Sequence, residues 1–436
     1  MADIRDVTSC PRCRADMGWM GDDLVCDCGY VLEFDENFFK ISGREEGSGV
    51  AKYYTREYYQ SSEYDYTSYR IGKIIGFARP AEGRRILDLG CGPGEIALRC
   101  AKMGAEVFGV DVSRDALRLG AERCAREEGR IHLFEFDGER VPFKDGSFDS
   151  IILSDVVEHV KDETLEILIK ECERLLARDG RLIIHTSPAR NIITLAKILG
   201  LISLGRIDLY SKLADSSYEF LHVRYHTIGS LTSVLKRRSL HPIVWGEFRY
   251  LEGSRLARFS GKLGLKDRLS DQLWCVASKD EKFLSISQSD EPRLALIEPP
   301  SQIDFGSCNE IYLSHGFYDS EFGSFRWTKK RAGLFIGVPE DPREIEITIH
   351  TSNPDMVERP VGVKLYLAGR LISKFDLASE EVQTRTFDIF GKVNPGAAEL
   401  EVEVVRTFVP EERGMGEDSR ELGVAIYRVS VKSSRP

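Results

Sequence analysis

Short apolar runs alternate with segments of helical periodicity through the middle of the chain. Residues 84–90 and 105–111 are nearly continuous apolar runs that end in glycine or aspartate, a pattern typical of buried strands. Residues 95–104 and 113–129 place apolar side chains every three or four positions and end at glycine, which predicts helices. This strand-then-helix order predicts a mostly parallel sheet with helices on both faces.

The same alternation continues to about residue 187. Residues 130–137, 148–154 and 181–187 are further predicted strands. The helix predicted over residues 162–180 has a single apolar face, which is made of Leu165, Leu168, Cys172, Leu175 and Leu176.

Beyond residue 278 the period changes. Residues 278–302 hold three prolines and many small polar residues, which predicts a linker. After it, apolar and other side chains alternate in three segments, the period of half-buried strands, and a short glycine-containing stretch predicts a hairpin turn between two of them. The strands are expected at 344–350, 361–367 and 399–405, and the turn at 367–371. The C-terminal part is therefore predicted to be a small antiparallel β domain.

Charge and hydropathy narrow the range of partners. The net charge of −10 over 436 residues argues against a nucleic-acid partner. The N-terminus lacks a signal-peptide pattern, and the longest apolar stretch, residues 192–205, contains Lys197 and is shorter than the about 20 residues that a membrane span needs. We expect a cytoplasmic protein. Residues 192–213 are expected to form a lid over the acceptor, to contact a membrane surface peripherally, or to pack on their own domain.

A glycine-rich loop follows the first predicted strand. Gly90, Gly92 and Gly94 let a ligand lie against the main chain at the start of a helix. Their spacing differs from the dinucleotide pattern, because Glu95 stands where a third glycine is expected. Three acids, Asp88, Asp111 and Asp137, lie at the ends of three successive strands. Acids at this edge of a parallel sheet suit a nucleoside that carries positive charge.

Four motifs in register carry a family resemblance. "ILDLGCGPG", "GVDVS", "VPFKDGSFDSIILSDVVEHV" and "RLIIHTSP" resemble the motif series of class I S-adenosylmethionine-dependent methyltransferases of the type-11 group, over roughly residues 84–278. The resemblance implies a Rossmann-like α/β fold with a seven-stranded, mostly parallel sheet whose last two strands are residues 241–248 and 271–279. It implies S-adenosylmethionine as cofactor, bound by Asp88, Gly90, Cys91, Gly92, Gly94, Asp111, Val112, Asp137, Gly138 and Ser154. A methyltransferase fold that serves only as a scaffold is the alternative.

Residues 154–160, "SDVVEHV", suggest the catalytic groups. Asp155, Glu158 and His159 resemble the acid-x-x-Glu-His element of metal-dependent O-methyltransferases of quinone biosynthesis and small-RNA methylation, although Asp155 replaces the first glutamate. His222 and His226 supply further ligands downstream. We expect Asp155, His159 and His222 to act beside the methyl group, either around a divalent ion such as magnesium or with a histidine as base. The alternative is that the segment has no catalytic role: Glu158 caps a helix and His159 is a packing residue.

Seven of the 16 tyrosines lie between Tyr53 and Tyr69, ahead of the first strand of the sheet. They predict either a tyrosine-lined lid over the cofactor or an ordinary packed helix. Arg70 is a candidate to bind a carboxylate of the substrate or the cofactor.

Four cysteines near the N-terminus have metal-ligand spacing. Cys10, Cys13, Cys26 and Cys28 form a C-x2-C-x12-C-x-C series, which suits a tetrahedral zinc site of structural role. The pairs resemble zinc-ribbon knuckles, although the second pair is one residue short. Residues 1–50 hold eleven acidic and five basic residues, the wrong balance for a nucleic-acid contact.

Residues 305–431 resemble a β-sandwich module attached to glycosyltransferases and related enzymes of cell-surface glycan assembly. Two interpretations of its polar and aromatic residues stay open: a carbohydrate-facing surface, or side chains that hold the sandwich together. The residues concerned are Tyr318, Trp327, Arg406, Asp418 and Arg420.

Together these features predict an enzyme of several parts: a zinc ribbon (1–35), a tyrosine-rich linker and lid helix (36–83), the methyltransferase domain (84–280), a linker (281–302) and a β-sandwich (303–436). The β-sandwich favours O-methylation of a sugar or a lipid-linked glycan, with glycan-assembly enzymes as partners. The alternatives are an RNA methyltransferase, a quinone or other small-molecule O-methyltransferase, and a non-enzymatic glycan-binding subunit.

Overall fold

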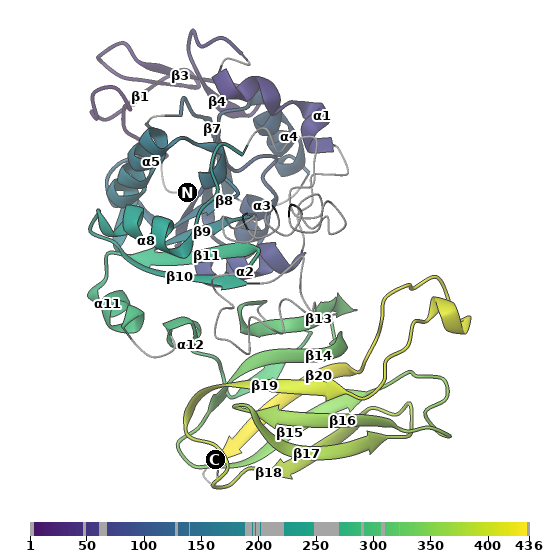
Figure 1. Ribbon diagram of the computed structural model, residues 1–436. Coiled ribbons are helices and arrows are strands. Elements are labelled where there is room, and N and C mark those ends of the chain that lie inside the picture. The colour runs from purple at the N-terminus through teal and green to yellow at the C-terminus, as the bar shows by residue number, and fades with distance from the viewer. Residues whose placement is uncertain are drawn as a thin grey trace. The chain divides into compact units, whose positions relative to one another are not determined.

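The computed structural model contains two compact units, Met1–Gln288 and Ser289–Pro436. It describes residues 4–46, 49–60, 68–126, 130–138, 140–187, 194, 197, 201, 222–247, 270–288, 292–306, 310–321 and 323–433. Figure 1 shows both units with their elements labelled. The division at residue 288 lies inside the predicted linker, where two short helices form: α11 (Glu281–Ser287) and α12 (Pro292–Ile297).

One large sheet organises the first unit. Its central strands follow the order β7-β6-β5-β8-β9-β11-β10, and β11 alone among these runs against the others. The predicted mostly parallel sheet is confirmed, including its last two strands. The bounds are β5 (Arg85–Leu89), β6 (Glu106–Asp111), β7 (Arg130–Glu135), β8 (Phe148–Ser154), β9 (Leu176–Thr186), β10 (His241–Glu247) and β11 (Gln272–Ser278).

Helices cover both faces of this sheet. Helices α5 (Asp162–Leu175) and α8 (Ile228–Lys236) share one apolar core with Leu87 and Leu89. Neighbouring strand residues such as Asp88 point to the opposite face, because side chains alternate along a strand. That face is covered by α2 (Ser68–Ala78), α3 (Glu95–Lys102) and α4 (Arg114–Cys124).

The N-terminal residues extend the same sheet. Four antiparallel strands, β1 to β4, continue it beyond β7, and β4 pairs in parallel with β7 through Phe39 and Phe134. Val7, Leu24 and Leu32 are buried in the core shared with α5. The predicted boundary at residue 35 falls inside the hairpin of β3 and β4. A segment of this size is too small to bury its own apolar side chains, so it packs them against the larger sheet. The strands are β1 (Gly18–Met20), β2 (Asp23–Val25), β3 (Val31–Asp35) and β4 (Phe38–Ile41).

Short helical segments connect these strands to the central sheet. They are η2 (Gly49–Tyr53) and α1 (Arg56–Gln60), followed by α2. Arg56 of α1 forms an ion pair with Glu122 of α4 at 2.9 Å. Lys73 of α2 reaches Glu247 at the end of β10 in a fully buried pair of 2.6 Å.

The second unit is an antiparallel β structure. Its main path is β17-β16-β19-β14-β20-β15-β18, with β12 paired to β20 and β13 to β14. The three predicted strands become β15 (Pro342–His350), β16 (Val361–Leu367) and β19 (Gly396–Val404). The predicted hairpin turn is confirmed, since Leu367 pairs with Arg370 around Ala368 and Gly369, both at positive φ.

The other strands of this unit are β12 (Gln302–Asp304), β13 (Leu313–Glu321), β14 (Phe325–Val338), β17 (Arg370–Leu377), β18 (Gln383–Asp388) and β20 (Ala425–Ser433). In the described part of the chain, no helix is both long and apolar enough to cross a bilayer.

Candidate active site

The glycine loop joins β5 to α3 and takes a shape that side chains would prevent. Gly90, Gly92 and Gly94 have φ of 83°, 51° and 77°, the region that favours glycine. A Cβ on Gly90 would lie 2.5 Å from Cγ2 of Val156, which follows β8. The first turn of α3 then begins at Glu95, so its free N–H groups face the end of the sheet.

Asp111 ties this loop to the end of β6. Its carboxylate accepts hydrogen bonds from the backbone N–H of Gly92 and that of Ser113, both at 2.8 Å. Burial raises the pKa of Asp111, and these amides oppose the rise. The amide of Val112 also donates to this carboxylate. A carboxylate has about four acceptor sites, so capacity remains for a ribose hydroxyl.

Asp88 lies beside Asp111 at the end of β5 and is 2% exposed. Its Oδ2 has no hydrogen-bond partner among the described residues, whereas the amide of Ala97 donates to the carboxyl group. Burial and the charge of Asp111 raise the pKa of Asp88 to about 7. A buried acceptor without a partner suits a cationic group such as the ammonium of S-adenosylmethionine.

The remaining predicted cofactor residues have varied surroundings. Cys91 is buried against Leu117 and Leu133, so it offers a ligand only its backbone. Val112 is half-buried against the core. Asp137 is exposed in the loop after β7, where Oδ1 accepts from the amide of Arg140 at 3.2 Å, and Gly138 follows it with φ 92°.

Asp155 stands directly after β8 with φ 55° and is held by its neighbours. Its Oδ2 pairs with Nη1 of Arg70 at 2.8 Å, and its Oδ1 lies 2.9 Å from Nδ1 of His185. The hydroxyl of Ser154 donates to the same carboxylate at 3.1 Å. Burial alone would raise the pKa of Asp155, but Arg70 and His185 lower it well below its ordinary value. These contacts make Asp155 a partner of Arg70, the candidate to bind a carboxylate of the substrate or the cofactor.

Glu158, His159 and His222 form the second group of the site. Their ligand atoms all lie within 4.8 Å of one another. Glu158 is buried and its Oε2 has no partner among the described residues, while burial and the charge of Asp155 raise its pKa well above the ordinary value. A carboxylate and two imidazoles in this arrangement fit a divalent cation.

The members of this group differ in part from the predicted set. Asp155, the first acid of the motif, is held by Arg70 and His185 and does not lie in the group. His226 is 1% exposed and its Nε2 lies 3.1 Å from the carbonyl of Val157. It is therefore a buried packing residue in the segment just before α8. Of the two downstream histidines, the structure therefore brings only His222 to Glu158 and His159.

Tyr54 contacts both the turn after β6, which holds Asp111, and the group of Glu158, His159 and His222. Its carbonyl accepts from the hydroxyl of Ser113 at 2.5 Å, and its ring lies 6.0 Å, edge to face, from that of His159. Burial raises the pKa of the Tyr54 phenol, and so do the charges of Tyr58, Asp111 and Glu158. Of the tyrosine-rich segment, Tyr54 thus contacts the site, and Tyr58 packs edge to face against Tyr54 at 5.5 Å between ring centroids. Tyr64 and Tyr66 lie outside the described residues, as do most of residues 192–213.

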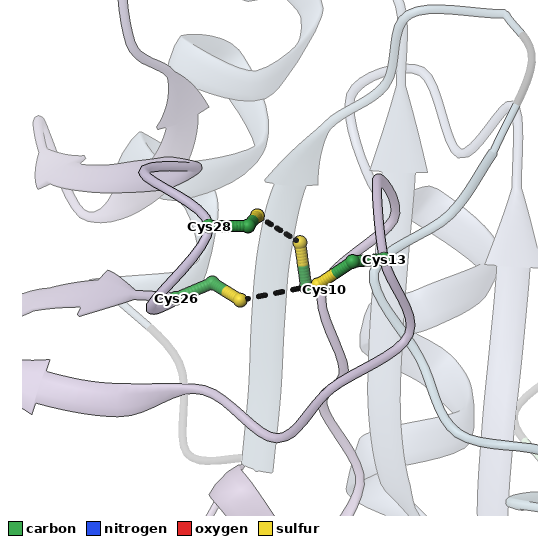
Figure 2. A group of neighbouring side chains, drawn as sticks. All are labelled: Cys10, Cys13, Cys26 and Cys28. Carbon is green, nitrogen blue, oxygen red and sulfur yellow. Dashed lines mark hydrogen bonds between the residues drawn. The ribbon is translucent and has the colours of Figure 1, made fainter.

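The four N-terminal cysteines converge, as Figure 2 shows. Sγ atoms of Cys10 and Cys28 lie 3.5 Å apart, and those of Cys13 and Cys26 lie 3.4 Å apart. All four lie within 4.8 Å of one another. Tetrahedral zinc with bonds of about 2.3 Å would separate sulfurs by roughly 3.8 Å, so the cluster fits such an ion. The backbone amide of Tyr30 lowers the pKa of Cys28 to about 7, whereas burial raises the pKa of Cys10.

In the second unit, two of the five residues considered for a carbohydrate-facing surface are engaged with protein. Trp327 is 6% exposed and packs with Phe408 and Leu422. Arg406 hydrogen-bonds Asn353 and Asp355. Both therefore stabilise the β structure, the second of the two interpretations.

The other three form a surface cluster. The guanidinium of Arg420 lies 5.2 Å from the centroid of the Tyr318 ring and pairs with Asp418 at 2.7 Å.

Two residues of the site had no role in the sequence analysis: Tyr54 as an individual side chain and His185, which orients Asp155. The available signal was His185, a titratable residue directly after the apolar residues 182–184 of a predicted strand.

Comparisons with known proteins agree with this geometry. Residues 86–180 match the family described as "Methyltransferase domain". The chain is 33% identical over 157 residues to a ubiquinone/menaquinone biosynthesis C-methyltransferase of Geotalea uraniireducens, covering 33% of this chain and 66% of that protein. It is 30% identical over 156 residues to a ubiquinone biosynthesis O-methyltransferase of Mesorhizobium japonicum, covering 36% of this chain and 60% of that protein.

The chain thus spans less than two thirds of the length of these curated relatives. Among solved structures, phosphoethanolamine N-methyltransferase 2 of Haemonchus contortus, in complex with S-adenosyl-L-methionine, is 18% identical with a TM-score of 0.35 over 51% of this chain and 59% of that one.

Proposed function

Because residues 86–180 are a methyltransferase domain, we propose that the protein transfers the methyl group of S-adenosylmethionine to a hydroxyl oxygen of a small quinone-type acceptor. One observation carries the donor: two buried acids, Asp88 and Asp111, flank a glycine loop whose amide at Gly92 fixes Asp111. Asp88 would accept the donor's ammonium and Asp111 its ribose hydroxyls. Asp137 and Gly138 would lie at its adenine edge.

The transfer itself is an in-line displacement at the methyl carbon of a sulfonium. The donor is already activated, so the chain mainly aligns donor and acceptor. A hydroxyl acceptor must also lose a proton, and Glu158, His159 and His222 lie together to promote this loss. A divalent cation held by these three residues would lower the pKa of the acceptor hydroxyl. Asp155, fixed by Arg70 and His185, would keep the end of β8 in place beneath the acceptor.

The names of the relatives support the choice of acceptor. The two curated relatives named above are a C-methyltransferase of ubiquinone/menaquinone biosynthesis and an O-methyltransferase of ubiquinone biosynthesis, and neither name points to the sugar or glycan acceptor expected from the C-terminal β structure. An aromatic hydroxyl is also acidic enough for a carboxylate and imidazole cluster to deprotonate near neutral pH when its charge is stabilised. The cysteine cluster is proposed to hold a structural zinc ion.

Two measurements test the proposal. Calorimetry with S-adenosylhomocysteine should show binding by the wild type. Incubation with labelled S-adenosylmethionine and a catechol-type probe should label an oxygen of the probe, and a chelator should lower the rate until magnesium is restored. Absence of nucleoside binding at all would refute the donor assignment. Binding without labelling of phenolic probes, together with labelling of a glycan or an RNA, would replace the acceptor.

A further inference from the structure

The loop that follows β7, residues 136–138 and 140–144 of the described chain, is bound at residues 140–144 by segment 7–14 near the N-terminus. The amide of Ser9 donates to the carbonyl of Pro142 at 2.9 Å, and the amide of Lys144 donates to the carbonyl of Val7 at 2.8 Å. Between them, Thr8 and Phe143 form an antiparallel bridge. This loop contains Asp137 and Gly138, the residues proposed for the adenine edge.

Side chains add to these backbone contacts. Arg14 donates through Nη1 to the carbonyl of Val141 at 3.3 Å and through Nη2 to both oxygens of Glu171 on α5, at 2.9 and 3.0 Å. In the opposite direction, Nη1 of Arg140 donates to the carbonyl of Pro11 at 3.5 Å. Side chains of segment 7–14 and of the loop thus each donate a hydrogen bond to the backbone of the other.

The turn that carries the second cysteine pair also contacts segment 7–14 directly. The guanidinium of Arg12 lies 5.4 Å from the centroid of the Tyr30 ring and donates to the carbonyl of Cys28 at 3.3 Å.

The cysteines shape the turns that make these contacts. The amide of Cys10 donates to Ala15 and that of Arg14 donates to Cys10, which closes the first turn. The amide of Cys26 donates to Tyr30 and that of Gly29 donates to Cys26, which closes the second. In Figure 2 the two turns face each other across the four sulfurs, so an ion bound there would join them.

We propose that the metal-bound cysteine cluster is part of the S-adenosylmethionine site, because it holds the loop of Asp137 and Gly138 in its binding position. This inference rests on the proposed function. The ion itself stays remote from the donor, and Arg14 and Pro11 transmit its effect as positioning residues, because they contact Val141 and Arg140 of the loop. Coupling of this kind is reciprocal, so a bound nucleoside also strengthens metal retention by the same factor.

The test measures affinity without turnover. Zinc-loaded full-length protein is titrated with S-adenosylhomocysteine by calorimetry, and then again after zinc is removed with a chelator. We expect Kd to rise about 10-fold on removal, with faster amide exchange in residues 136–144 and unchanged exchange in β8 and β9. In the reciprocal experiment, saturating S-adenosylhomocysteine should lower the Kd for zinc, measured by equilibrium competition with a colorimetric chelator, by about the same factor. Equal Kd values for the zinc-loaded and the zinc-free folded protein would overturn the inference.

A variant that keeps all four cysteines guards against simple unfolding. Arg14→Met removes the contact with Val141 and should raise Kd two- to fivefold while zinc content and circular dichroism stay unchanged. Lys40→Met is the matched control. It also removes a basic side chain from the N-terminal strands, but Lys40 lies in β4 and pairs with exposed Asp35. An Arg14→Met protein that binds like the control would count against the positioning role. If zinc-loaded wild type binds no S-adenosylhomocysteine, the proposed function fails instead.

Discussion

The donor side and the acceptor side of the candidate site are built in different ways. On the donor side, backbone amides of the glycine loop and of the turn after β6 hold Asp111, and the partners Gly92 and Asp111 are 19 positions apart. On the acceptor side, side chains from β8, α2, β9 and the segment before α8 meet, and Glu158 keeps a buried oxygen without a partner among the described residues. The position of Asp111 is therefore fixed by backbone amides, whereas acceptor chemistry depends on side chains from distant segments.

The largest expected effect is on the donor side. Asp111→Ala removes the acceptor of two amides and the proposed ribose contact, and we expect Kd for S-adenosylhomocysteine to rise about 100-fold, since hydrogen bonds to charged groups contribute about 1.5–3 kcal/mol. Calorimetry measures this change. Asp22→Ala, at an exposed position in the N-terminal segment, is the control. A rise below threefold would show that the donor site is not organised by this carboxylate.

The next effect should separate the two sides. Glu158→Gln is expected to lower methyl transfer about 100-fold, because positioned proton-transfer groups contribute factors of this order, while Kd for S-adenosylhomocysteine changes less than twofold. Rate and binding are measured on the same preparations, with Glu163→Gln on the exposed first turn of α5 as control. Equal losses of binding and rate would erase the distinction between donor and acceptor sides.

Asp155→Asn tests the support beneath the acceptor. Asparagine tolerates the positive φ of this position, so the backbone should stay while the charge that faces Arg70 is lost. We expect the first unit to lose about 1–2 kcal/mol of unfolding free energy in urea titrations. Adding Arg70→Met should recover part of the loss. A double variant that is less stable than the sum of the single variants would contradict the pairing.

The smallest effect concerns pH. The pKa of Asp88 is raised to about 7 in the folded chain, so between pH 4 and 7 the unfolded chain has released a proton that the folded chain keeps. The stability of the ligand-free protein therefore falls as pH rises through this range. Asp88→Asn should raise Tm at pH 8 by a few degrees, change it little at pH 4, and weaken S-adenosylhomocysteine binding. Identical Tm shifts at both pH values would show that Asp88 is ionised throughout.

What could be predicted from the sequence follows the same division. The glycine loop, Asp88, Asp111 and the four cysteines were accessible, because positive φ, strand ends and ligand spacing are local properties. The turn at Ala368 and Gly369 was accessible for the same reason. In each case a few neighbouring residues determine the geometry.

Pairings between distant segments were not accessible. Nothing near Arg70 indicates that it meets Asp155, and nothing near His222 distinguishes it from His226, which packs against Val157. The position of β4 beside β7 depends on a core that residues 4–46 share with α5. Such contacts depend on how whole faces of helices and strands pack against each other. This packing cannot be inferred from the local pattern of a single sequence.

The addition of β4 to the sheet has a consequence for association between copies. In a seven-stranded sheet β7 would present a row of unpaired backbone groups, a surface on which two copies can join or aggregate. Here β4 occupies that position, and within the described chain the outermost strand on this side is β1, only three residues long. The N-terminal segment thus also protects the protein against self-recognition through backbone pairing.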